Sequence, residues 1–322
     1  MRVVVTGAAG FIGSHLCERL LADGNEVVGI DSFSDFYERP LKERNLEVAL
    51  ENPNFVLEEL DLHHAYVRKT LRGADVVFHL AGLDGVSPSW GDHFDRYVED
   101  NVVATQRLLE AIRGEGTGRL VFASSSSVYG EAEMLPTKES AVPRPSSPFG
   151  MTKLAAEHLA FVYMRSFGLM LTSLRYFTVY GPRQRPDMAF VRFMKALVDD
   201  AEIEIFGDGE QTRDFTYVSD AVDATVRAAS ADVAGQIVNI GGGSRVTVNR
   251  VLDTLEEITG LKARRKLLPA APGDPRHTGA SINVARERLG WEPRVALRDG
   301  LARQWTWFEE ARHTARASRS VS

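Results

Sequence analysis

Three glycines near the start of the chain have a spacing suited to binding phosphate. Gly7, Gly10 and Gly13 follow directly after the β-branched run Arg2–Thr6. Gly7 permits the tight turn from strand to helix, Gly10 lets backbone approach a pyrophosphate, and Gly13 lets the helix pack close to the strand. The start of the helix offers free N–H groups and a partial positive charge. Because the glycines lie between an expected strand and an expected helix, we interpret them as a dinucleotide-binding loop.

Asp31 stands where the second expected strand ends, 18 residues after Gly13. A carboxylate at this place accepts hydrogen bonds from both ribose hydroxyls and repels a 2′-phosphate. No arginine lies directly beside Asp31, and the nearest one along the chain is Arg39. The sequence therefore predicts NAD rather than NADP. The other expected cofactor contacts are in the loop and after the third and fourth strands: Gly7, Gly10, Phe11, Ile12, Gly13, Asp61, Leu62, Leu80, Ala81 and Gly82.

The segments around these residues alternate between strand and helix. The expected strands are Arg2–Thr6, Glu26–Asp31, Phe55–Leu60, Asp75–Leu80, Arg119–Ser124 and Leu169–Tyr176. The expected helices are Phe11–Asp23, His64–Leu71, Arg96–Arg113 and Phe149–Ser166. This alternation predicts an α/β fold, a doubly wound parallel sheet of the Rossmann type.

The pattern becomes less regular after Tyr180. Further helices are expected over Met188–Val198, Thr247–Thr259, Asn283–Leu289 and Leu297–Ala311, with a short strand over Glu202–Phe206. We expect residues 1–176, joined by about 215–240, to form the NAD-binding domain. Residues 177–214 and 241–311 are expected to form a smaller mixed α/β substrate domain, and residues 312–322 a disordered tail.

The composition excludes several classes of protein. The chain has 322 residues, 44% hydrophobic and 25% charged, with a net charge of −6 and the single cysteine Cys17. A mildly acidic chain argues against nucleic acid as the main partner, and one cysteine cannot build a disulfide framework or a cysteine-based zinc cluster. No apolar run approaches the ~18 residues of a membrane span. We expect a soluble cytoplasmic protein that works without a metal or a membrane.

Several longer motifs resemble the NAD-dependent epimerase/dehydratase family, the extended short-chain dehydrogenases that act on nucleotide sugars. They are TGAAGFIGSH at 6–15, VVGIDSFSDFY at 27–37, HLAG at 79–82, NVVATQRLLEA from Asn101, SSSSVYG at 124–130, LRYFTVYGPRQ at 174–184, RDFTYVSD at 213–220 and LGWEP at 289–293. The resemblance covers nearly the whole chain. It implies an NAD-dependent enzyme that oxidises a sugar transiently at C4, and it adds Asn101, Lys153 and Tyr176 to the expected cofactor contacts.

The family's oxidation step uses a serine or threonine, a tyrosine and a lysine. The hydroxyl residue corresponds to Ser125 and the lysine to Lys153, but the tyrosine expected four residues before the lysine is Phe149. Phenylalanine keeps the ring and lacks the group that would take the sugar hydroxyl proton. Phe149 and Lys153 lie on one face of a helix, so the arrangement is retained while the usual base is absent.

Two explanations of Phe149 remain open from the sequence. Either the chain binds NAD and a nucleotide sugar without catalysis, or another group removes the proton. The candidates are Lys153, if burial lowers its pKa, a relay through Ser125 or Ser126, and Asp84 in the loop that covers the sugar in relatives. A solvated loop aspartate is an equal interpretation of Asp84. Because the cofactor loop, lysine and serine are retained together, we favour an active enzyme.

The resemblance also assigns the nucleotide-sugar contacts. Arg213 corresponds to an arginine that meets the diphosphate, Gly207 leaves room for the base, and Asp274 corresponds to an acid that contacts ribose. Thr178 stands where the family commonly has an asparagine, and Ser125 also faces the sugar. A UDP-sugar is the expected substrate. Relatives dimerise through the two helices that span Arg96–Arg113 and Phe149–Ser166 here, so a homodimer is expected.

The exact reaction is predicted from two departures. Sugar 4,6-dehydratases carry an Asp-Glu pair before Val-Tyr-Gly, where this chain has Ser126 and Ser127. Together with Phe149, this looks most like the NDP-hexosamine 5,6-dehydratases of tunicamycin biosynthesis. That resemblance implies loss of water across C5–C6 of UDP-N-acetylglucosamine. The alternatives are a UDP-hexose or UDP-hexosamine 4-epimerase, and a non-catalytic NAD and nucleotide-sugar binding protein.

Overall fold

A computed structural model describes residues 1–63, 67–229 and 231–320. Its centre is a seven-stranded sheet in the order β11-β6-β5-β4-β1-β2-β3, and every neighbouring pair runs parallel. The strands are β1 (Arg2–Thr6), β2 (Glu26–Asp31), β3 (Phe55–Glu59), β4 (Val76–His79), β5 (Arg119–Ser125), β6 (Met170–Tyr176) and β11 (Ile237–Ile240). The strand order reverses between β1 and β4, which opens a crevice at the carboxyl ends of these strands. The expected Rossmann-type α/β fold is confirmed.

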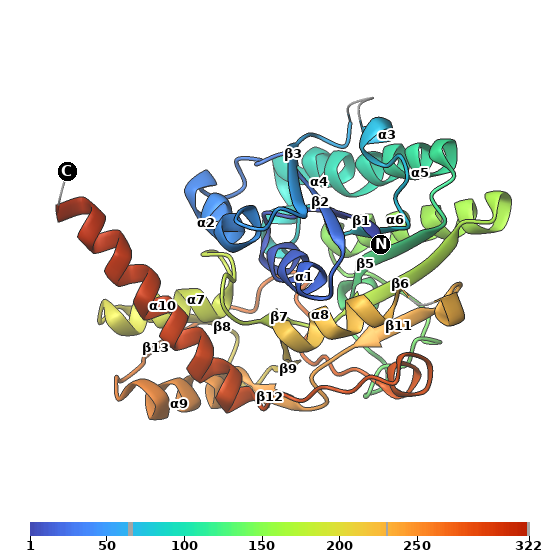
Figure 1. The fold of residues 1–322 in the computed structure, drawn as a ribbon. Helices are drawn as coiled ribbons and strands as arrows, with labels where there is room; N and C mark the ends of the chain where they lie inside the picture. The colour runs from blue at the N-terminus through green and yellow to red at the C-terminus, as the bar shows by residue number, and fades with distance from the viewer. Residues whose placement is uncertain (64–66, 230, 321–322) are drawn as a thin grey trace.

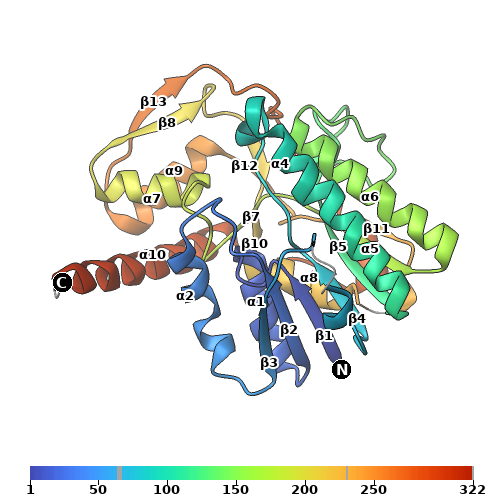
Figure 2. The ribbon, with the colours of Figure 1, turned by 90° about the horizontal axis from the view of Figure 1, so that it is seen from above.

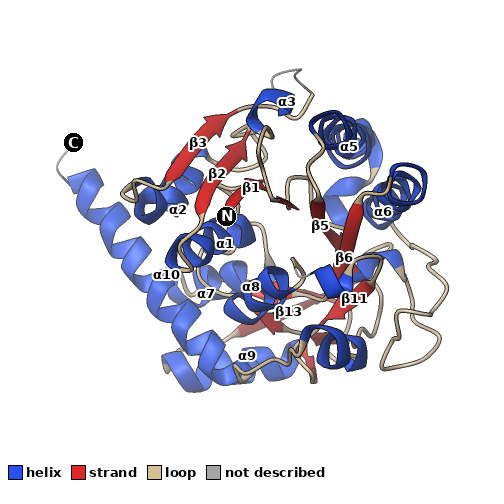
Figure 3. Cartoon of the chain, turned by 45° about the vertical axis from the view of Figure 1, so that its right-hand side comes forward, coloured by secondary structure: helices blue, strands red, loops and turns tan. Residues whose placement is uncertain are grey.

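Helices cover both faces of this sheet. They are α1 (Phe11–Ala22), α2 (Arg39–Leu50), α3 (Val67–Thr70), α4 (Phe94–Val98), α5 (Ala104–Glu115), α6 (Pro148–Phe167) and α8 (Val218–Arg227). Figure 3 shows α5 and α6 on one side of the sheet and α1 with α8 on the other. Each face has its own apolar core, with Leu108 and Ala160 in one and Leu16 and Ala221 in the other. Because both faces are covered, the central strands are buried and read as continuous apolar runs.

The sequence pattern misses α2 and places three other elements inexactly. The buried positions of α2 are Lys42, Asn45, Leu46 and Ala49, of which two are polar, so its apolar periodicity is weak. The helix expected over residues 96–113 is interrupted by a π-helical segment, η3 (Glu99–Val103), between α4 and α5. The expected helix His64–Leu71 is reduced to α3, and residues 64–66 lie outside the described residues. A π-helical segment, η6 (Ala285–Leu289), occupies part of the helix expected over 283–289.

The C-terminal part consists of three two-stranded sheets and three longer helices. The sheets pair β7 (Val179–Tyr180) with β10 (Thr216–Tyr217), β8 (Glu202–Phe206) with β13 (Arg264–Leu268), and β9 (Thr212–Asp214) with β12 (Arg245–Thr247). The helices are α7 (Ala189–Val198), α9 (Val248–Thr259) and α10 (Leu297–Ser320). Figure 2 shows β8, β13, α7 and α9 grouped on one side of the large sheet.

Two observations bear on the expected division of the chain. β11 pairs with β6 in the large sheet and α8 packs against α1, so these segments return to the N-terminal part. We keep the expected domain boundaries as a proposal on this basis. The C-terminal end differs from expectation, because α10 continues to Ser320 instead of ending near residue 311.

Short one-turn segments complete the list: η1 (Ser87–Ser89), η2 (Gly91–His93), η4 (Ser126–Val128) and η5 (Ala231–Val233). Within the described residues, no helix is long and apolar enough to cross a membrane.

Candidate active site

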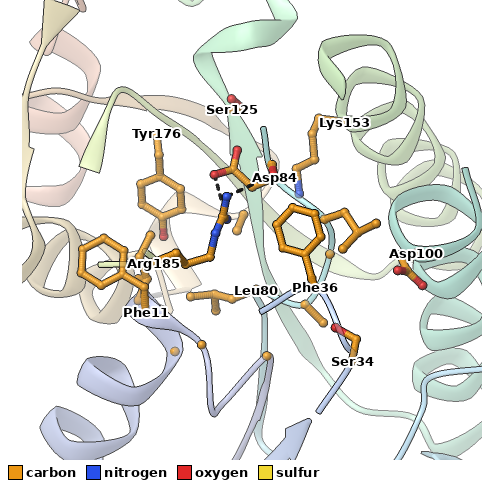
Figure 4. A pocket seen from close by; sticks show the side chains of 18 of the residues that line it. Phe11, Ser34, Phe36, Leu80, Asp84, Asp100, Ser125, Lys153, Tyr176 and Arg185 are labelled. Carbon is orange, nitrogen blue, oxygen red and sulfur yellow. Dashed lines mark hydrogen bonds and ion pairs between the residues drawn. The ribbon is translucent and has the colours of Figure 1, made fainter. Parts of the chain in front are cut away.

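A large pocket lies at the strand ends and collects most of the expected site residues (Figure 4). Those that line it are Gly7, Gly10, Phe11, Ile12, Gly13, Asp31, Asp61, Leu62, Leu80, Ala81, Gly82, Asp84, Ser125, Ser126, Phe149, Lys153, Tyr176 and Thr178. Four expected residues do not line it: Asn101, Gly207, Arg213 and Asp274. The pocket therefore joins the glycine loop to α6, which carries Phe149 and Lys153, as the spacing of the motifs predicts.

The glycine loop has the close approaches that its residue types suggest. Gly7 has a φ of +71°, and a Cβ there would lie 2.8 Å from the backbone N of Ala81. A Cβ on Gly13 would lie 2.0 Å from the carbonyl oxygen of Gly7, so only glycine lets α1 pack this closely on the turn. Gly10 is the N-cap residue directly before α1, and it has no side chain that could bond the first N–H groups of the helix. These N–H groups are available to a phosphate at the pocket.

Asp31 is fixed by backbone and is accompanied by a lysine that the sequence analysis did not consider. Its carboxylate accepts hydrogen bonds from the N–H groups of Ala9 at 3.0 Å and Phe33 at 2.9 Å. Lys42 from α2 also lines the pocket and donates to the carbonyl oxygen of Ser34 at 2.8 Å. Arg39 is held elsewhere, by Glu43 and Glu59. The arginine nearest in sequence is therefore tied to carboxylates.

Tyr37 is a second pocket residue that the sequence analysis missed. Its hydroxyl is buried and has no hydrogen-bond partner in the described part of the chain. Burial raises the pKa of the phenol above its ordinary value. A buried polar atom is nearly always satisfied, so this hydroxyl is suited to a ligand group in the pocket. In the sequence, the indication of this residue is the motif Asp-Phe-Tyr at 35–37, which follows Asp31 closely.

Two polar residues near the pocket, His79 and Asn101, already have partners within the protein. His79 is fully buried and lies between Thr6 and Thr105, with ring nitrogens 2.7 and 2.9 Å from their hydroxyls. Burial lowers its pKa to about 3, so it is a neutral core histidine. Asn101 binds the backbone N–H and carbonyl of Leu83 at 2.8 and 3.0 Å and the hydroxyl of Thr152 at 3.0 Å. It therefore ties the loop after β4 to α6 instead of lining the pocket.

Phe149 and Lys153 both face the pocket from α6. Phe149 is buried and packs edge-on against Tyr97, with ring centroids 6.3 Å apart. Lys153 is 8% exposed, and its Nζ lies 4.8 Å from the ring centroid of Phe122. Lys153 has no hydrogen bond or ion pair within the described residues. Burial lowers its pKa to about 8, while the nearby charges of Asp84 and Glu157 raise it in part.

The hydroxyl groups that could replace the absent phenol divide into two sets. Ser125 and Ser126 line the pocket, and the hydroxyl of Ser125 accepts a hydrogen bond from the N–H of Ser127 at 3.1 Å. The phenols of Tyr129 and Tyr176 are used elsewhere, 2.7 Å from Asn239 and 2.6 Å from Thr225. Neither phenol is placed to take the role of the absent tyrosine.

Asp84 enters the pocket in an ion pair that the sequence did not reveal. Its carboxylate lies 3.2 Å from Nη1 of Arg185, which follows it by 101 residues (Figure 4). Arg185 also donates to the backbone carbonyl of Asp84 at 3.2 Å and to Asp187 at 2.9 and 3.0 Å. Its guanidinium lies over the ring of Phe36, 5.1 Å from the centroid. Asp84 is therefore a pocket carboxylate in an ion pair, and its side chain remains 49% exposed.

The remaining substrate residues form a second group. Arg213 on β9 lies 2.7 Å from Asp274 and also donates to the carbonyl oxygens of Thr212 and Arg276. Gly207 has a φ of +88° at the end of β8 and precedes Asp208, which pairs with Arg276 at 2.7 Å. The structure thus brings Arg213 and Asp274 together, as expected, but outside the pocket that contains Thr178.

A family model and known relatives match most of the chain. Residues 3–241 match the model of the NAD dependent epimerase/dehydratase family. The chain is 45% identical over 306 residues to an uncharacterized UDP-glucose epimerase of Bacillus subtilis, covering 94% of this chain and 96% of the relative. It is 37% identical over 311 residues to a UDP-glucuronate 4-epimerase of Thermodesulfobacterium geofontis, covering 95% and 96%.

Solved structures give a corresponding result. A UDP-glucuronic acid 4-epimerase from Bacillus cereus in complex with UDP-glucuronic acid and NAD has a TM-score of 0.94 and 43% identity, covering 97% of this chain and all of that chain. A variant of that enzyme with one tyrosine replaced by phenylalanine, in complex with NAD and UDP-4-deoxy-4-fluoro-glucuronic acid, gives the same values. The tunicamycin 5,6-dehydratase has a TM-score of 0.85 and 29% identity, covering 96% and 98%.

These comparisons correct the expected reaction. The prediction of a 5,6-dehydratase acting on UDP-N-acetylglucosamine is wrong, because the relatives with high identity are UDP-glucose and UDP-glucuronate 4-epimerases. The prediction failed because it relied on Phe149 and the serine run, and neither residue type by itself specifies elimination. The expectations of an enzyme and of NAD as its cofactor are confirmed. The chain belongs to the NAD-dependent epimerase/dehydratase family.

Proposed function

We propose that the protein is an NAD-dependent 4-epimerase of a UDP-linked hexose or hexuronic acid. The observation that carries this proposal is the meeting of the glycine loop, Ser125 and Lys153 in one pocket. The similarity over 97% of the chain to a UDP-glucuronic acid 4-epimerase with both ligands bound supports it. The absence of an Asp-Glu pair at Ser126 and Ser127 agrees with a reaction that needs no acid for a departing water.

The pocket residues fit NAD in type and position. Gly10 leaves the N-terminus of α1 open to the pyrophosphate, and Asp31 suits the adenosine ribose. The buried hydroxyl of Tyr37 has no protein partner, so it can bond a polar group of the nucleotide. When bound, NAD accepts the hydride from C4 of the sugar and later returns it. The small residues Ala81 and Gly82 leave room for the cofactor beside β4.

We propose that Lys153 receives the proton of the 4-hydroxyl group. The neutral amine can accept a proton, and burial brings its pKa to about 8, near working pH. Ser125 is proposed to hold the sugar oxygen, and Ser126 is the alternative route through water. Lys153 would hold this proton while C4 is a ketone. It would return the proton to the same oxygen when C4 is reduced on its opposite face, which leaves the amine neutral again.

A phenylalanine in this family is compatible with holding both ligands. The Bacillus cereus variant in which a tyrosine is replaced by phenylalanine was obtained with NAD and a UDP-sugar analogue. This supports binding by a chain with Phe149, and it leaves non-catalytic binding as the second candidate function. Phe149 is the specific observation that favours that second candidate, since it lacks the usual proton acceptor.

The second group of residues is proposed to hold the nucleotide. Arg213 has donors suited to the diphosphate, and Asp274 beside it suits the ribose. Gly207 leaves space next to the strand end for the uracil ring. Thr178 lines the pocket and is proposed to face the sugar.

We also propose a homodimer formed through α5 and α6. Met151, Val162 and Phe167 on α6 are 40%, 54% and 54% exposed, and burial of their apolar surface against a second copy would favour association. Light scattering should give twice the mass of one chain. We propose that the dimer works in the cytoplasm, where cells keep NAD and UDP-sugars.

The experiment that tests the function is product analysis. The protein, loaded with NAD, is incubated with UDP-glucose and, separately, with UDP-glucuronic acid, and the nucleotide sugars are separated by chromatography. A 4-epimerase gives a new isomer of unchanged mass without added NADH. No new isomer from either sugar, with binding of both intact, would instead support the non-catalytic candidate.

A further inference from the structure

The helix α6 carries a second buried charge one turn after Lys153. Glu157 follows Lys153 by four residues and is 2% exposed. Residues four apart lie on the same face of a helix and are neighbours there. A carboxylate beside a lysine ordinarily binds the ammonium group and favours its protonated form. Lys153 nevertheless has no ion pair in the part of the chain that the structure describes. The carboxylate of Glu157 is held by other partners.

Both oxygens of Glu157 are bound by side chains of β6. Nη2 of Arg175 donates to Oε1 at 2.5 Å, and Nε of Arg175 donates to Oε2 at 3.1 Å. The hydroxyl of Ser173 also donates to Oε2, at 2.9 Å. The guanidinium of Arg175 lies over the ring of Tyr129, 4.7 Å from the centroid. Arg175 therefore holds the carboxylate through two hydrogen bonds and is itself packed in place.

Stability alone explains this buried pair poorly. A buried ion pair is often no more stable than well-packed apolar side chains in its place. Nη1 of Arg175 is buried and has no hydrogen-bond partner among the described residues, which adds a further cost. The pair does have an electrostatic effect, because the unit charges of Arg175 and Glu157 cancel. A carboxylate therefore lies one turn from Lys153 without a net negative charge of the pair.

The charges around Lys153 come from several elements. They are Glu157 on α6, Asp84 in the loop after β4, His79 on β4 and Asp100, which lines the same pocket from η3. Asp84 is paired with Arg185, and His79 is neutral because burial lowers its pKa to about 3. Burial also lowers the pKa of Lys153, and the charges of Asp84 and Glu157 oppose this shift. The pairing of Glu157 therefore influences how readily Lys153 becomes a neutral amine.

We infer that Arg175 is a positioning residue for Lys153, because it withholds the carboxylate of Glu157 from the amine. This inference rests on the proposed function, in which Lys153 takes the proton of the 4-hydroxyl group. A lysine bound to a carboxylate is held as an ammonium ion and cannot accept that proton. The pair of Arg175 with Glu157 leaves Lys153 free to alternate between amine and ammonium in the pocket.

The test measures the titration of Lys153 directly in the full-length, nucleotide-free protein. NMR of isotope-labelled lysine Cε groups follows the protonation of each lysine, and Lys153→Met identifies the signal. Arg175→Gln frees Glu157 to bind Lys153 and should raise the midpoint of this titration by at least about one pH unit. The pH midpoint of kcat in the NAD-loaded variant should rise by a similar amount.

Three further variants separate this effect from a loss of packing. The double variant of Arg175→Gln with Glu157→Gln has no carboxylate to release, so the rise should disappear. Arg175→Lys keeps the positive charge and should titrate much like the wild type. Arg68→Gln is the matched control, because it removes an arginine from an exposed ion pair, with Glu115 at 2.7 Å, and should leave the midpoint unchanged. Circular dichroism checks that each variant is folded.

The results that overturn the inference are separate from those that overturn the proposed function. An unchanged midpoint in a folded Arg175→Gln overturns the inference, as does a rise that persists in the double variant. If Arg175→Gln does not fold, Glu157→Gln decides: it should lower the midpoint, and an unchanged midpoint overturns the inference. If the wild type converts no UDP-sugar, the proposed function fails, while the titration of Lys153 still tests the role of Arg175.

Discussion

Replacing Lys153 by methionine should stabilise the protein when no cofactor is bound. Methionine fills a similar volume without the charge, and Lys153 is 8% exposed with no hydrogen bond or ion pair in the described residues. Burial lowers the pKa from 10.5 to about 8. Because each pH unit corresponds to about 1.4 kcal/mol, the buried charge costs about 3 to 4 kcal/mol of folding free energy. The cation–π contact between the ammonium group of Lys153 and the ring of Phe122 offsets about 0.5–1 kcal/mol of this cost.

The sign of the pH dependence follows from proton binding. Between pH 8 and 10.5 the folded lysine loses its proton while the unfolded one keeps it, so the unfolded state binds more protons and wild-type stability rises with pH. The advantage of Lys153→Met should therefore be full below pH 8 and should shrink by about 1.4 kcal/mol per pH unit above it.

Urea unfolding of nucleotide-free protein between pH 6.5 and 9.5 measures this difference. Lys69→Met makes the same change at an exposed position and should alter stability little at any pH. A Lys153→Met variant that is less stable than the wild type throughout this range would refute the reasoning. That result would mean that the ammonium is well solvated or paired in the folded protein.

Three further predictions concern the cofactor, the nucleotide and the missing phenol. NADP should bind at least about tenfold more weakly than NAD, because a 2′-phosphate would face the fixed carboxylate of Asp31; equal affinities measured by calorimetry would contradict this. Arg213→Ala should weaken binding of the UDP-sugar by about 2 kcal/mol and leave NAD binding unchanged, whereas the reverse pattern would show that Arg213 serves the cofactor. The kcat of the wild type should rise with pH through about 8, as the amine of Lys153 becomes neutral. Phe149→Tyr should flatten this pH dependence by supplying a phenol, and Lys153→Ala should abolish turnover in both backgrounds.

Local sequence signals were sufficient to predict the strands and helices of the Rossmann half and the place of its cofactor loop. The runs of β-branched residues give parallel strands because they are buried on both faces. The roles expected for Gly7 and Gly13 hold in the structure, since a side chain at either position would collide with backbone. Such signals are local, so they can be read from a few neighbouring residues without knowing the rest of the fold.

Signals that depend on distant segments could not be read in this way. The helix α2 places Lys42 in the pocket, but its buried face is half polar and has little apolar period. Asp84 and Arg185 meet only because the loop after β4 and the segment after β7 converge at the strand ends. Asn101 has the residue type of a ligand contact, yet its partners Leu83 and Thr152 come from two other elements.

The choice of reaction was missed for a different reason. Phe149 and the serine run remove groups that a 4,6-dehydratase or an ordinary epimerase would use, and a missing group does not specify which reaction replaces it. The similarity to 4-epimerases favours return of the hydride to C4, and we propose Lys153 in place of the phenol because it lines the same pocket as Phe149. The central claim is therefore that the chain epimerises its substrate through hydride return to C4 without the family tyrosine.

The most direct test of that claim uses UDP-glucose with deuterium at C4. The NAD-loaded wild type should convert it to the 4-epimer with the deuterium still at C4 and the mass unchanged, and turnover should be slower than with the unlabelled sugar. Such a result requires the deuteride to leave C4 and to return to it within one active site that lacks the family tyrosine. Absence of the epimer in the wild type, with epimer formation by Phe149→Tyr, would contradict the account and show a protein that binds both ligands without catalysis.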